Sequence, residues 1–424
     1  MFWNKTQETI SGKKLEELQL KKLRFLLKSV SKHPFYKRYK DVQLNKLSDL
    51  QKISFTSKKD IQRYPNLDFF NSPLKDIVDI HSTTGTTSKP IFVGYTKKDL
   101  ETWSELTARV LVAGGLAKQD LAQNMLGYGL FNGGLAMHKG AEKIGATIVP
   151  SSNGNTLRQI NLIIDLGVTA VISSPSYVLH IIDVADKHAR DIKNSKLKTG
   201  FLTGETWTEN MRREIESGLN IKSYDNYGQT EVFGPGIAYE CQQQKGMHVS
   251  EDHFLVEVIN PKTKEVLSPG EKGELVFTSL TKQGFPVIRF RTGDISRILE
   301  EKCPCGRTFR RIQKITGRTD DLLTINGNKI FPSQIEDLLG DEKYATYNYE
   351  VIIEQKNHKD ELTMLIETPH LLRKHPKEIL IIEEEMAERM KASMSVNVKV
   401  KLLKPGAISC YPGKKKRVID KRKE

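Results

Sequence analysis

Hydrophobic positions recur at helical spacing near the start of the chain, in the segment LEELQLKKLRFLLKSVSKHPFYKR. This spacing predicts an amphipathic helix that packs on the main body and ends at Pro34. The apolar side chains that fall near one side of this helix are those of Leu15, Leu18, Leu23, Leu26, Leu27 and Val30.

The pattern changes between about residues 78 and 200. Short apolar runs such as ATIVP and VTAVISS alternate with polar helical stretches such as NTLRQINLIIDLG and YVLHIIDVADKHA. This alternation favours a parallel sheet covered by helices. Further on, DHFLVEVINPKTKEVLSPGEKGELVFTSL has the period of two that is typical of strands, and turn residues between its runs indicate antiparallel pairing.

After GRTDD the chain reads as a small α+β unit. YEVIIEQ and ELTMLIET are strand-like, KEILIIEEEMAERMKASM is helical, and VNVKVKLL is a last strand. We therefore predict an α/β protein with two domains. A large domain with mixed and parallel sheets spans residues 1–319, and a small mobile lid spans residues 320–424.

Composition narrows the function classes. The formal charge of +14 would suit nucleic acid, a membrane surface or a polyanionic small molecule, but most lysines stand among acidic residues. The sequence lacks the interleaved basic and aromatic motif that would indicate nucleic-acid binding, so we do not expect a nucleic-acid partner. No leader and no apolar run of membrane-spanning length is seen, which predicts a cytoplasmic protein that does not bind membranes. The oligomeric state is left open by the sequence, which is compatible with a homodimer.

The stretch HSTTGTTSKPIFVGYT follows the strand-like DIVDI and is rich in Ser, Thr and Gly. Backbone amides and hydroxyls in such a loop can wrap the phosphates of a nucleotide. An ordinary polar turn between strands would have the same composition, so the interpretation depends on the motifs downstream.

Those motifs are SYDNYGQTEVFG, FPVIRFRTGD, ITGRTDDLLTINGNKIFPSQIE and, near the terminus, PGKKKRV. Their order is that of the adenylate-forming superfamily. Within it the chain resembles phenylacetate-CoA ligases in segments such as GYGLFNGGLAMHKGAEKIGAT, ECQQQKGMHVSEDHF and CPCGRTFRRI. The resemblance implies ATP, Mg²⁺ and coenzyme A as reactants and cofactors, and a C-terminal domain that rotates between two half-reactions.

The resemblance also assigns the nucleotide site by position. Tyr227 would lie against adenine, while Thr230 and Glu231 would face the α-phosphate and a magnesium ion. Alternatively, Tyr227 is an ordinary core aromatic residue and Glu231 an ordinary surface carboxylate. Asp294 would accept the ribose hydroxyls, with Arg318 on the other side of the ribose. The remaining matched positions are the phosphate loop Thr83, Thr84, Gly85, Thr86, Thr87 and Lys89, the adenine-side loop Gly204, Glu205 and Thr206, and Asp225, Asn226 and Gly228. Ser88 departs from the glycine usual in the family.

Two assignments fall on the lid. The spacing GKxxR indicates Lys414 as the catalytic lysine, which would approach the carboxylate and the α-phosphate as a mobile point charge. Lys415 and Lys416 are competing neighbours, and a run of lysines is also typical of a solvated tail. Asp320 matches the hinge of the family, where changes in backbone angles would swing the lid.

The acid is expected at GYGLFNGG. Tyr128 and Phe131 would form aromatic walls around a planar ring, and Gly133 and Gly134 would leave room for it. Alternatively, both aromatic side chains simply fill the core. Phenylacetate is the substrate implied by the resemblance alone.

The chain has four cysteines, too few for a disulfide scaffold. Cys241, Cys303 and Cys305 together with His248 form the ligand set of a closed tetrahedral zinc site. Buried reduced thiols beside a hydrogen-bonded histidine are the alternative. Cys410 stands outside this group and has no inferred role.

The leading hypothesis is thus an ATP-dependent, AMP-forming ligase that joins an aryl acid to coenzyme A. A second hypothesis keeps adenylation but delivers the acyl group to an amine or to a carrier-protein thiol. A third, a non-catalytic protein on the same fold, would show decayed motifs, and the motifs are intact.

Overall fold

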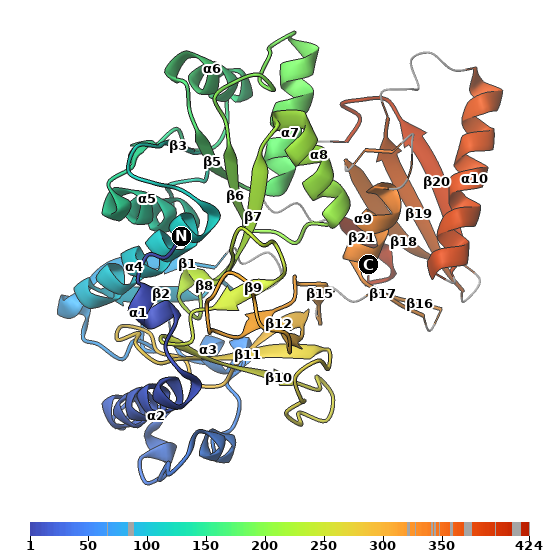
Figure 1. The fold of residues 1–424 in the computed structure, drawn as a ribbon. Helices are drawn as coiled ribbons and strands as arrows, with labels where there is room; N and C mark the ends of the chain where they lie inside the picture. The colour runs from blue at the N-terminus through green and yellow to red at the C-terminus, as the bar shows by residue number, and fades with distance from the viewer. Residues whose placement is uncertain are drawn as a thin grey trace.

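The computed structural model describes residues 1–423 except 66, 84–88, 320–322, 327, 341, 343–344, 347, 357–358, 369–374, 395 and 409–416. It has a large N-terminal domain and a small C-terminal domain, which stands apart in orange and red in Figure 1. The prediction of an α/β protein with a small α+β lid is therefore confirmed. The proposed boundary at Asp320 falls on a residue outside the described ones and stays a prediction.

Among the described residues, three α-helices precede the first strand, α1 (Lys5–Glu8), α2 (Gly12–Ser29) and α3 (Lys58–Gln62). Three short 3₁₀ helices, η1 (Lys37–Tyr39), η2 (Leu47–Lys52) and η3 (Leu74–Asp76), lie in the same part of the chain. Helix α2 is the amphipathic helix that the sequence predicted. Leu15, Leu23, Leu26 and Leu27 are buried, and Leu18 is half-buried. The helix packs on the large domain, where its Gln19 donates a hydrogen bond of 2.8 Å to the carbonyl of Glu251.

A nine-stranded sheet forms the centre of the large domain. Its strands, in order across the sheet, are β13 (Ile298–Leu299), β14 (Arg311–Ile312), β9 (Met247–Val249), β8 (Gly234–Glu240), β7 (Lys222–Gln229), β6 (Thr199–Thr203), β5 (Ala170–Ser173), β3 (Leu121–Asn124) and β4 (Thr147–Val149). The strands from β7 to β4 are parallel, as predicted, and those from β13 to β7 are antiparallel. The helices that accompany this sheet are α4 (Lys97–Gly114), α5 (Gly133–Ile144), α6 (Thr156–Leu166), α7 (Pro175–Lys187) and α8 (Glu209–Leu219).

Two smaller sheets complete the large domain. One is the antiparallel hairpin of β1 (Ile77–Ser82) and β2 (Phe92–Thr96). The other is antiparallel and contains β10 (Phe254–Ile259), β11 (Gly273–Ser279), β12 (Phe290–Ser296) and β15 (Gly317–Arg318).

The antiparallel pairing of this second sheet was predicted, but its burial was not. An alternating strand should bury one face, yet Phe254, Val256 and Val258 are buried and so is the intervening Leu255. All four belong to one core cluster that also contains residues of α2 and of the central sheet. The sheet is therefore covered on both faces.

The lid has its own core. Its elements are β16 (Leu323–Ile325), β17 (Asn328–Ile330), α9 (Pro332–Gly340), β18 (Tyr349–Lys356), β19 (Lys359–Glu367), α10 (Pro376–Met394), β20 (Val398–Leu403) and β21 (Val418–Asp420). Helix α10 covers the outer face of the lid sheet, and α9 lies on the side of the large domain, next to α8 (Figure 1). The two central strands β18 and β19, the strand β20 and helix α10 were predicted, whereas α9, β21 and the β16–β17 hairpin were not.

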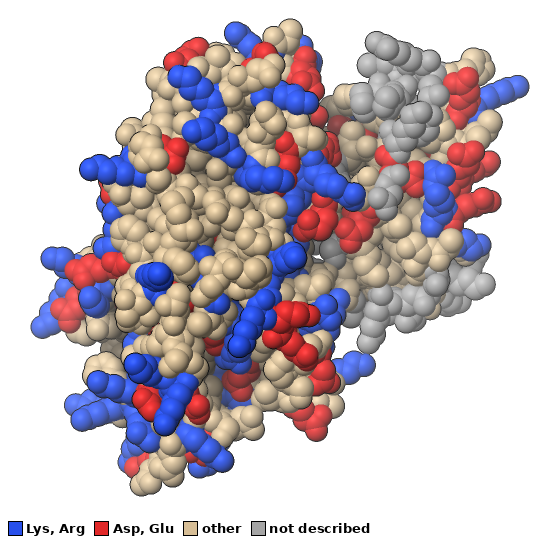
Figure 2. All heavy atoms as spheres, in the orientation of Figure 1, with Lys and Arg blue, Asp and Glu red and all other residues tan. Residues whose placement is uncertain are grey.

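The distribution of charge on the surface agrees with the sequence, in which most lysines stand among acidic residues. On the face drawn in Figure 2, lysines and arginines are interspersed with acidic residues. None of the described helices has the length and apolarity needed to cross a bilayer.

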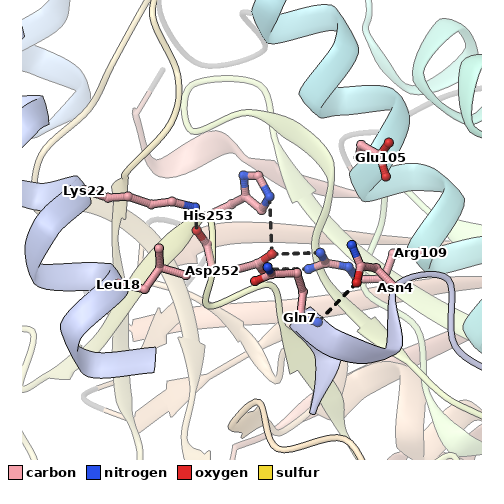
Figure 3. A pocket seen from close by; sticks show the side chains of 8 residues that line it. All are labelled: Asn4, Gln7, Leu18, Lys22, Glu105, Arg109, Asp252 and His253. Carbon is pink, nitrogen blue, oxygen red and sulfur yellow. Dashed lines mark hydrogen bonds and ion pairs between the residues drawn. The ribbon is translucent and has the colours of Figure 1, made fainter. Parts of the chain in front are cut away.

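A buried ion pair joins α4 to the turn before β10. Both guanidinium Nη atoms of Arg109 donate to the carboxylate of Asp252, at 2.7 and 2.9 Å. The pair borders a pocket of about 260 Å³ that side chains of α1 and α2 line from the other side (Figure 3). Burial alone would raise the pKa of Asp252, but His253 and Arg109 outweigh it and lower the pKa. None of the lining residues is a predicted nucleotide or acid ligand.

Arg109→Ala should lower the free energy of unfolding by about 3–5 kcal/mol, because it removes the guanidinium that pairs with the buried Asp252 carboxylate. The matched control is Lys98→Ala on the same helix. Lys98 pairs with Glu101 but its side chain is 66% exposed, so we expect a loss of at most about 0.5 kcal/mol. Urea unfolding of both variants measures the difference, and equal losses would contradict the assigned role of the buried pair.

Candidate active site

Three of the residues assigned to the nucleotide meet at one place. The Tyr227 hydroxyl donates to Asp294 Oδ2 at 2.7 Å, and Arg318 Nη1 donates to Asp294 Oδ1 at 2.6 Å. The residues come from β7, β12 and β15, and the last two pair directly across their strands. Burial, and then the Asp294 charge, raise the pKa of Tyr227 well above its usual value, so its hydroxyl stays protonated.

A fourth member was missed by the sequence assignments. Gln229 Nε2 donates to Asp294 Oδ2 at 2.6 Å. Gln229 stands in the variable position of the SYDNYGQTE motif, so the motif drew attention to its neighbours rather than to it. Among the described residues, three donors thus hold the Asp294 carboxylate, and Asp294 is 5% exposed.

The turn after β7 carries Thr230 and Glu231. The backbone amides of Val232 and Phe233 both donate hydrogen bonds to the Gln229 carbonyl, at 3.2 and 2.9 Å, and these bonds form the turn. Glu231 is 8% exposed, and its Oε1 lies 3.3 Å from the ammonium of Lys58 on α3. No motif had singled out Lys58, because this contact joins residues that are far apart in the sequence.

A second lysine, on which Glu231 acts electrostatically, was also missed. Lys282 is buried, and its Nζ lies 4.0 Å from the ring centroid of Tyr95, a favourable cation–π distance. Burial lowers the pKa of Lys282 to about 7, although Asp99 and Glu231 act in the opposite direction. Glu231 is therefore in direct contact with Lys58 and also acts electrostatically on Lys282.

The phosphate-loop assignments are described only at their ends. The Thr83 hydroxyl accepts a hydrogen bond from the Ile91 amide at 3.1 Å, which closes the base of the loop. Lys89 is exposed, and its carbonyl accepts from Gln62 Nε2. The other predicted loop residues, Thr84, Gly85, Thr86 and Thr87, lie outside the described residues, as does Lys414.

The remaining nucleotide assignments are spread around β6 and β7. Gly204 has a φ of +94°, which favours glycine, and Glu205 Oε1 accepts from the Ser176 amide at 2.6 Å. Thr206 is half-buried beside them. On β7, a Cβ at Gly228 would stand 2.4 Å from the Gly234 carbonyl oxygen, so only glycine fits there.

Asp225 and Asn226 form hydrogen bonds with neighbouring residues of the protein. The Asp225 amide donates to Glu240 Oε2 at 2.8 Å, and burial raises the pKa of the Asp225 carboxyl. Asn226 Oδ1 accepts from the Gly236 amide at 3.1 Å. The Asn226 side chain therefore ties β7 to β8, and its carbonyl accepts a hydrogen bond of 2.7 Å from the Thr203 hydroxyl.

The segment GYGLFNGG, residues 127–134, was predicted to bind the acid. It begins after β3 and runs into α5, at the carboxyl end of the parallel strands, where ligands bind in open α/β sheets. Tyr128 is half-buried there, whereas Phe131 is 52% exposed and forms no enclosed wall. A Cβ at Gly134 would meet the Gly127 carbonyl oxygen at 2.4 Å. Gly134 therefore serves the close approach of two backbone segments, while Gly133 has more space around it.

The four predicted metal ligands do come together. Their ligand atoms, from Cys241, His248, Cys303 and Cys305, all lie within 4.8 Å of one another. Cys241 Sγ is 3.7 Å from Cys303 Sγ, and Cys305 Sγ is 3.4 Å from His248 Nε2. In a tetrahedral zinc site with about 2.3 Å bonds, two sulfur ligands stand about 3.8 Å apart.

The surroundings of the cluster also suit a metal. His248 Nδ1 lies 3.2 Å from the Phe309 carbonyl, an acceptor that fixes the tautomer with Nε2 free to coordinate. The neighbouring Arg307 donates to the buried Glu8 at 2.6 Å, which fastens the N-terminal segment to the CPC turn. The donor set and its spacing therefore fit zinc.

Comparisons with known proteins place this site in a family. The AMP-binding enzyme family matches residues 22–281, and the AMP-binding enzyme C-terminal domain matches residues 327–422. A phenylacetate-coenzyme A ligase of Aromatoleum evansii is 39% identical over 98% of this chain and 96% of its own length. The Escherichia coli enzyme of the same name is 37% identical over 98% of this chain and 97% of its own.

Solved structures agree. 2-Hydroxyisobutyryl-CoA ligase in the postadenylation state, with 2-HIB-AMP bound, superimposes with a TM-score of 0.93 at 26% identity, covering 100% of this chain and 93% of its own. The same ligase in the thioesterification state, with CoA bound, gives a TM-score of 0.73. The fold and the site thus define an adenylate-forming enzyme. Within that class, the chain belongs to the phenylacetate-CoA ligase family.

Proposed function

We infer that the chain is an ATP-dependent ligase that joins an aryl acid, of the phenylacetate type, to coenzyme A. The observation that carries this assignment is the identity of 39% to a phenylacetate-coenzyme A ligase along almost the whole of both chains. In the first half-reaction a carboxylate oxygen attacks the α-phosphorus and the bond to pyrophosphate breaks. In the second, the CoA thiolate attacks the acyl carbon and AMP leaves.

The described residues support specific roles in the first step. Asp294 binds the ribose hydroxyls, since Tyr227, Gln229 and Arg318 hold its carboxylate in one orientation. The Tyr227 ring and the backbone of the Gly204 loop border the adenine. Thr230 and Glu231 face the α-phosphate and a magnesium ion that is held mostly by phosphate oxygens.

The lid orientation suits this step. The chain resembles the postadenylation state of 2-hydroxyisobutyryl-CoA ligase more closely than its thioesterification state, with TM-scores of 0.93 and 0.73. We propose that rotation about Asp320 exchanges the two states. In the first state Lys414 would lie at the α-phosphate.

A panel of phenylacetate, benzoates and their hydroxylated or aminated analogues, assayed for AMP formation with and without CoA, tests the function. We expect AMP release with at least one aryl acid, and a clear stimulation by CoA. AMP release that does not respond to CoA would instead favour transfer to an amine or to a carrier protein. No AMP release with any aryl acid would contradict the assignment.

We also propose that Cys241, His248, Cys303 and Cys305 hold a structural zinc ion that fastens the CPC turn to β8 and β9. The ion would stabilise the fold and take no part in the reaction, because a closed site has no open coordination position. Protein purified without added metal should contain about one zinc ion per chain.

Cys303→Ser should lose the metal and unfold at a lower temperature than the wild type. Cys410→Ser is the matched control, because the sequence places Cys410 outside the predicted ligand set, and it should retain the zinc. Elemental analysis and thermal unfolding measure both effects. Wild-type protein that is free of zinc when freshly folded would refute the metal site.

A further inference from the structure

Two charged residues of the lid form a largely buried ion pair. Glu336 stands on α9 and is 8% exposed, and Arg417 precedes β21 and donates from Nη1 to Glu336 Oε1 at 2.8 Å. Burial raises the pKa of Tyr349, so its hydroxyl keeps its proton and donates to the same oxygen at 3.2 Å. The Arg417 guanidinium also lies 4.7 Å from the centroid of the Tyr349 ring. These contacts hold the pair in one arrangement within the lid.

The ion pair lies where the lid meets the large domain. Helix α9 of the lid is next to α8 of the large domain (Figure 1). Asn210 on α8 donates from Nδ2 to the carbonyl of Asp337 at 3.3 Å, and Asp337 directly follows Glu336. A rotation of the lid would therefore separate Asn210 from Asp337 while the ion pair stays within the lid.

A carboxylate of the large domain acts on this pair. Glu205, in the loop assigned to the adenine side, interacts electrostatically with both Glu336 and Arg417. Its Oε1 accepts a hydrogen bond of 2.6 Å from the Ser176 amide at the start of α7, which fixes Glu205 to the large domain. Across the boundary Glu205 attracts Arg417 and repels an ionised Glu336.

The surroundings of Glu336 make its charge sensitive to the lid orientation. Burial raises the pKa of Glu336 to about 7 against the opposing effect of Arg417, and Glu205 and Asp337 raise it further. In an orientation without Glu205 and without the cover of α8, the pKa should lie nearer the usual value of about 4.3. Protonation of Glu336 therefore favours the orientation seen here, and this preference is lost as the pH rises through about 7.

We propose that Arg417 and Glu336 are positioning residues, which dock the lid on the adenine-side loop and so favour the orientation for adenylation over that for thioester formation. Arg417 supplies the attraction to Glu205, and Glu336 orients the guanidinium. This inference rests on the proposed two-step ligase function. It also rests on the greater similarity of the chain to a ligase in the postadenylation state than in the thioesterification state.

The first test measures the two half-reactions separately. Aryl-acid-dependent pyrophosphate exchange reports the first step, and thioester formation from a prepared aryl-adenylate and CoA reports the second. Arg417→Gln should lower the ratio of the first rate to the second by about fivefold or more, the smallest usual coupling between two sites. Arg417→Lys keeps the charge and should restore most of the ratio. A purely structural role would lower both rates alike.

Arg389→Gln is the matched control. Arg389 pairs with Glu342 in the same lid, but its side chain is 54% exposed. Both half-reactions of this variant should stay within about twofold of the wild type, because an exposed ion pair contributes little.

The second test is a pH profile, which also decides the matter if Arg417→Gln does not fold. Glu336→Gln keeps an acceptor for Arg417 and Tyr349 but cannot ionise. The ratio of exchange to thioester formation in the wild type, divided by the same ratio in Glu336→Gln, should fall about threefold or more between pH 6 and pH 8. The ionisation of the CoA thiol affects both proteins alike and cancels in this quotient.

A quotient that does not change with pH, or an equal loss of both half-reactions in a folded Arg417→Gln, would overturn the inference and leave the ligase assignment intact. Wild-type protein that shows no pyrophosphate exchange with any aryl acid would instead overturn the ligase assignment.

Discussion

Lys414→Ala should lower the rate of aryl-acid-dependent pyrophosphate exchange by about 10²–10³-fold, the usual cost of removing one group that stabilises charge in a transition state. Charge develops at the α-phosphate and on the departing pyrophosphate in that step. The second step should be nearly unaffected when a chemically prepared aryl-adenylate and CoA are supplied. A mobile lysine thus acts in one half-reaction only.

The matched controls are the two neighbouring lysines. Lys415→Ala and Lys416→Ala should each retain pyrophosphate exchange to within about threefold, because a solvated charge contributes little. All three lysines lie outside the described residues, so the choice among them depends on the GKxxR spacing. Undiminished exchange in Lys414→Ala, or a larger loss in either neighbour, would refute the assignment.

Asp294→Ala should lower kcat/KM for ATP by about 10²-fold, because hydrogen bonds to a charged group contribute about 1.5–3 kcal/mol each. The effect should appear mainly in KM, since the ribose is bound alike in the ground and transition states. Tyr227→Phe should cause a smaller loss of kcat/KM for ATP than Asp294→Ala. It keeps the ring for the adenine and removes one of the described donors that hold Asp294.

A binding measurement separates this role from a loss of folding. The wild type should bind AMP more tightly than 2′,3′-dideoxy-AMP, whereas Asp294→Ala should bind the two nucleotides about equally. Thermal unfolding should accompany the measurement, because Asp294→Ala also leaves Arg318 without this partner. Equal affinities in the wild type would exclude Asp294 as the ribose ligand.

The sequence predicted those features that depend on neighbours along the chain. Helix α2 follows from the 3.6-residue spacing of its leucines, and the parallel strands follow from their alternation with helices. The burial of both faces of β10 could not be predicted in this way. It depends on α2 and on the central sheet, which pack against it from distant parts of the chain.

The site shows the same division. Motifs located Tyr227, Asp294 and Arg318, and the structure shows that they meet. Two partners of the predicted site residues were not found from the sequence. Lys58 contacts Glu231 across a long stretch of sequence, and Gln229, which donates to Asp294, occupies a variable position in its motif. Gly134 was predicted to leave room for the acid. The structure shows instead that it allows the close approach of the Gly127 carbonyl oxygen.

The central claim is that the acid is activated as an acyl-adenylate, and isotope transfer tests it most directly. An aryl acid labelled with ¹⁸O in its carboxylate is incubated with ATP, CoA and the wild-type protein, and the products are analysed by mass spectrometry. Because the acid oxygen that attacks the α-phosphorus leaves with that phosphorus, one labelled oxygen should appear in AMP, and none in pyrophosphate. Label in pyrophosphate or inorganic phosphate, or unlabelled AMP beside newly formed aryl-CoA, would contradict the account.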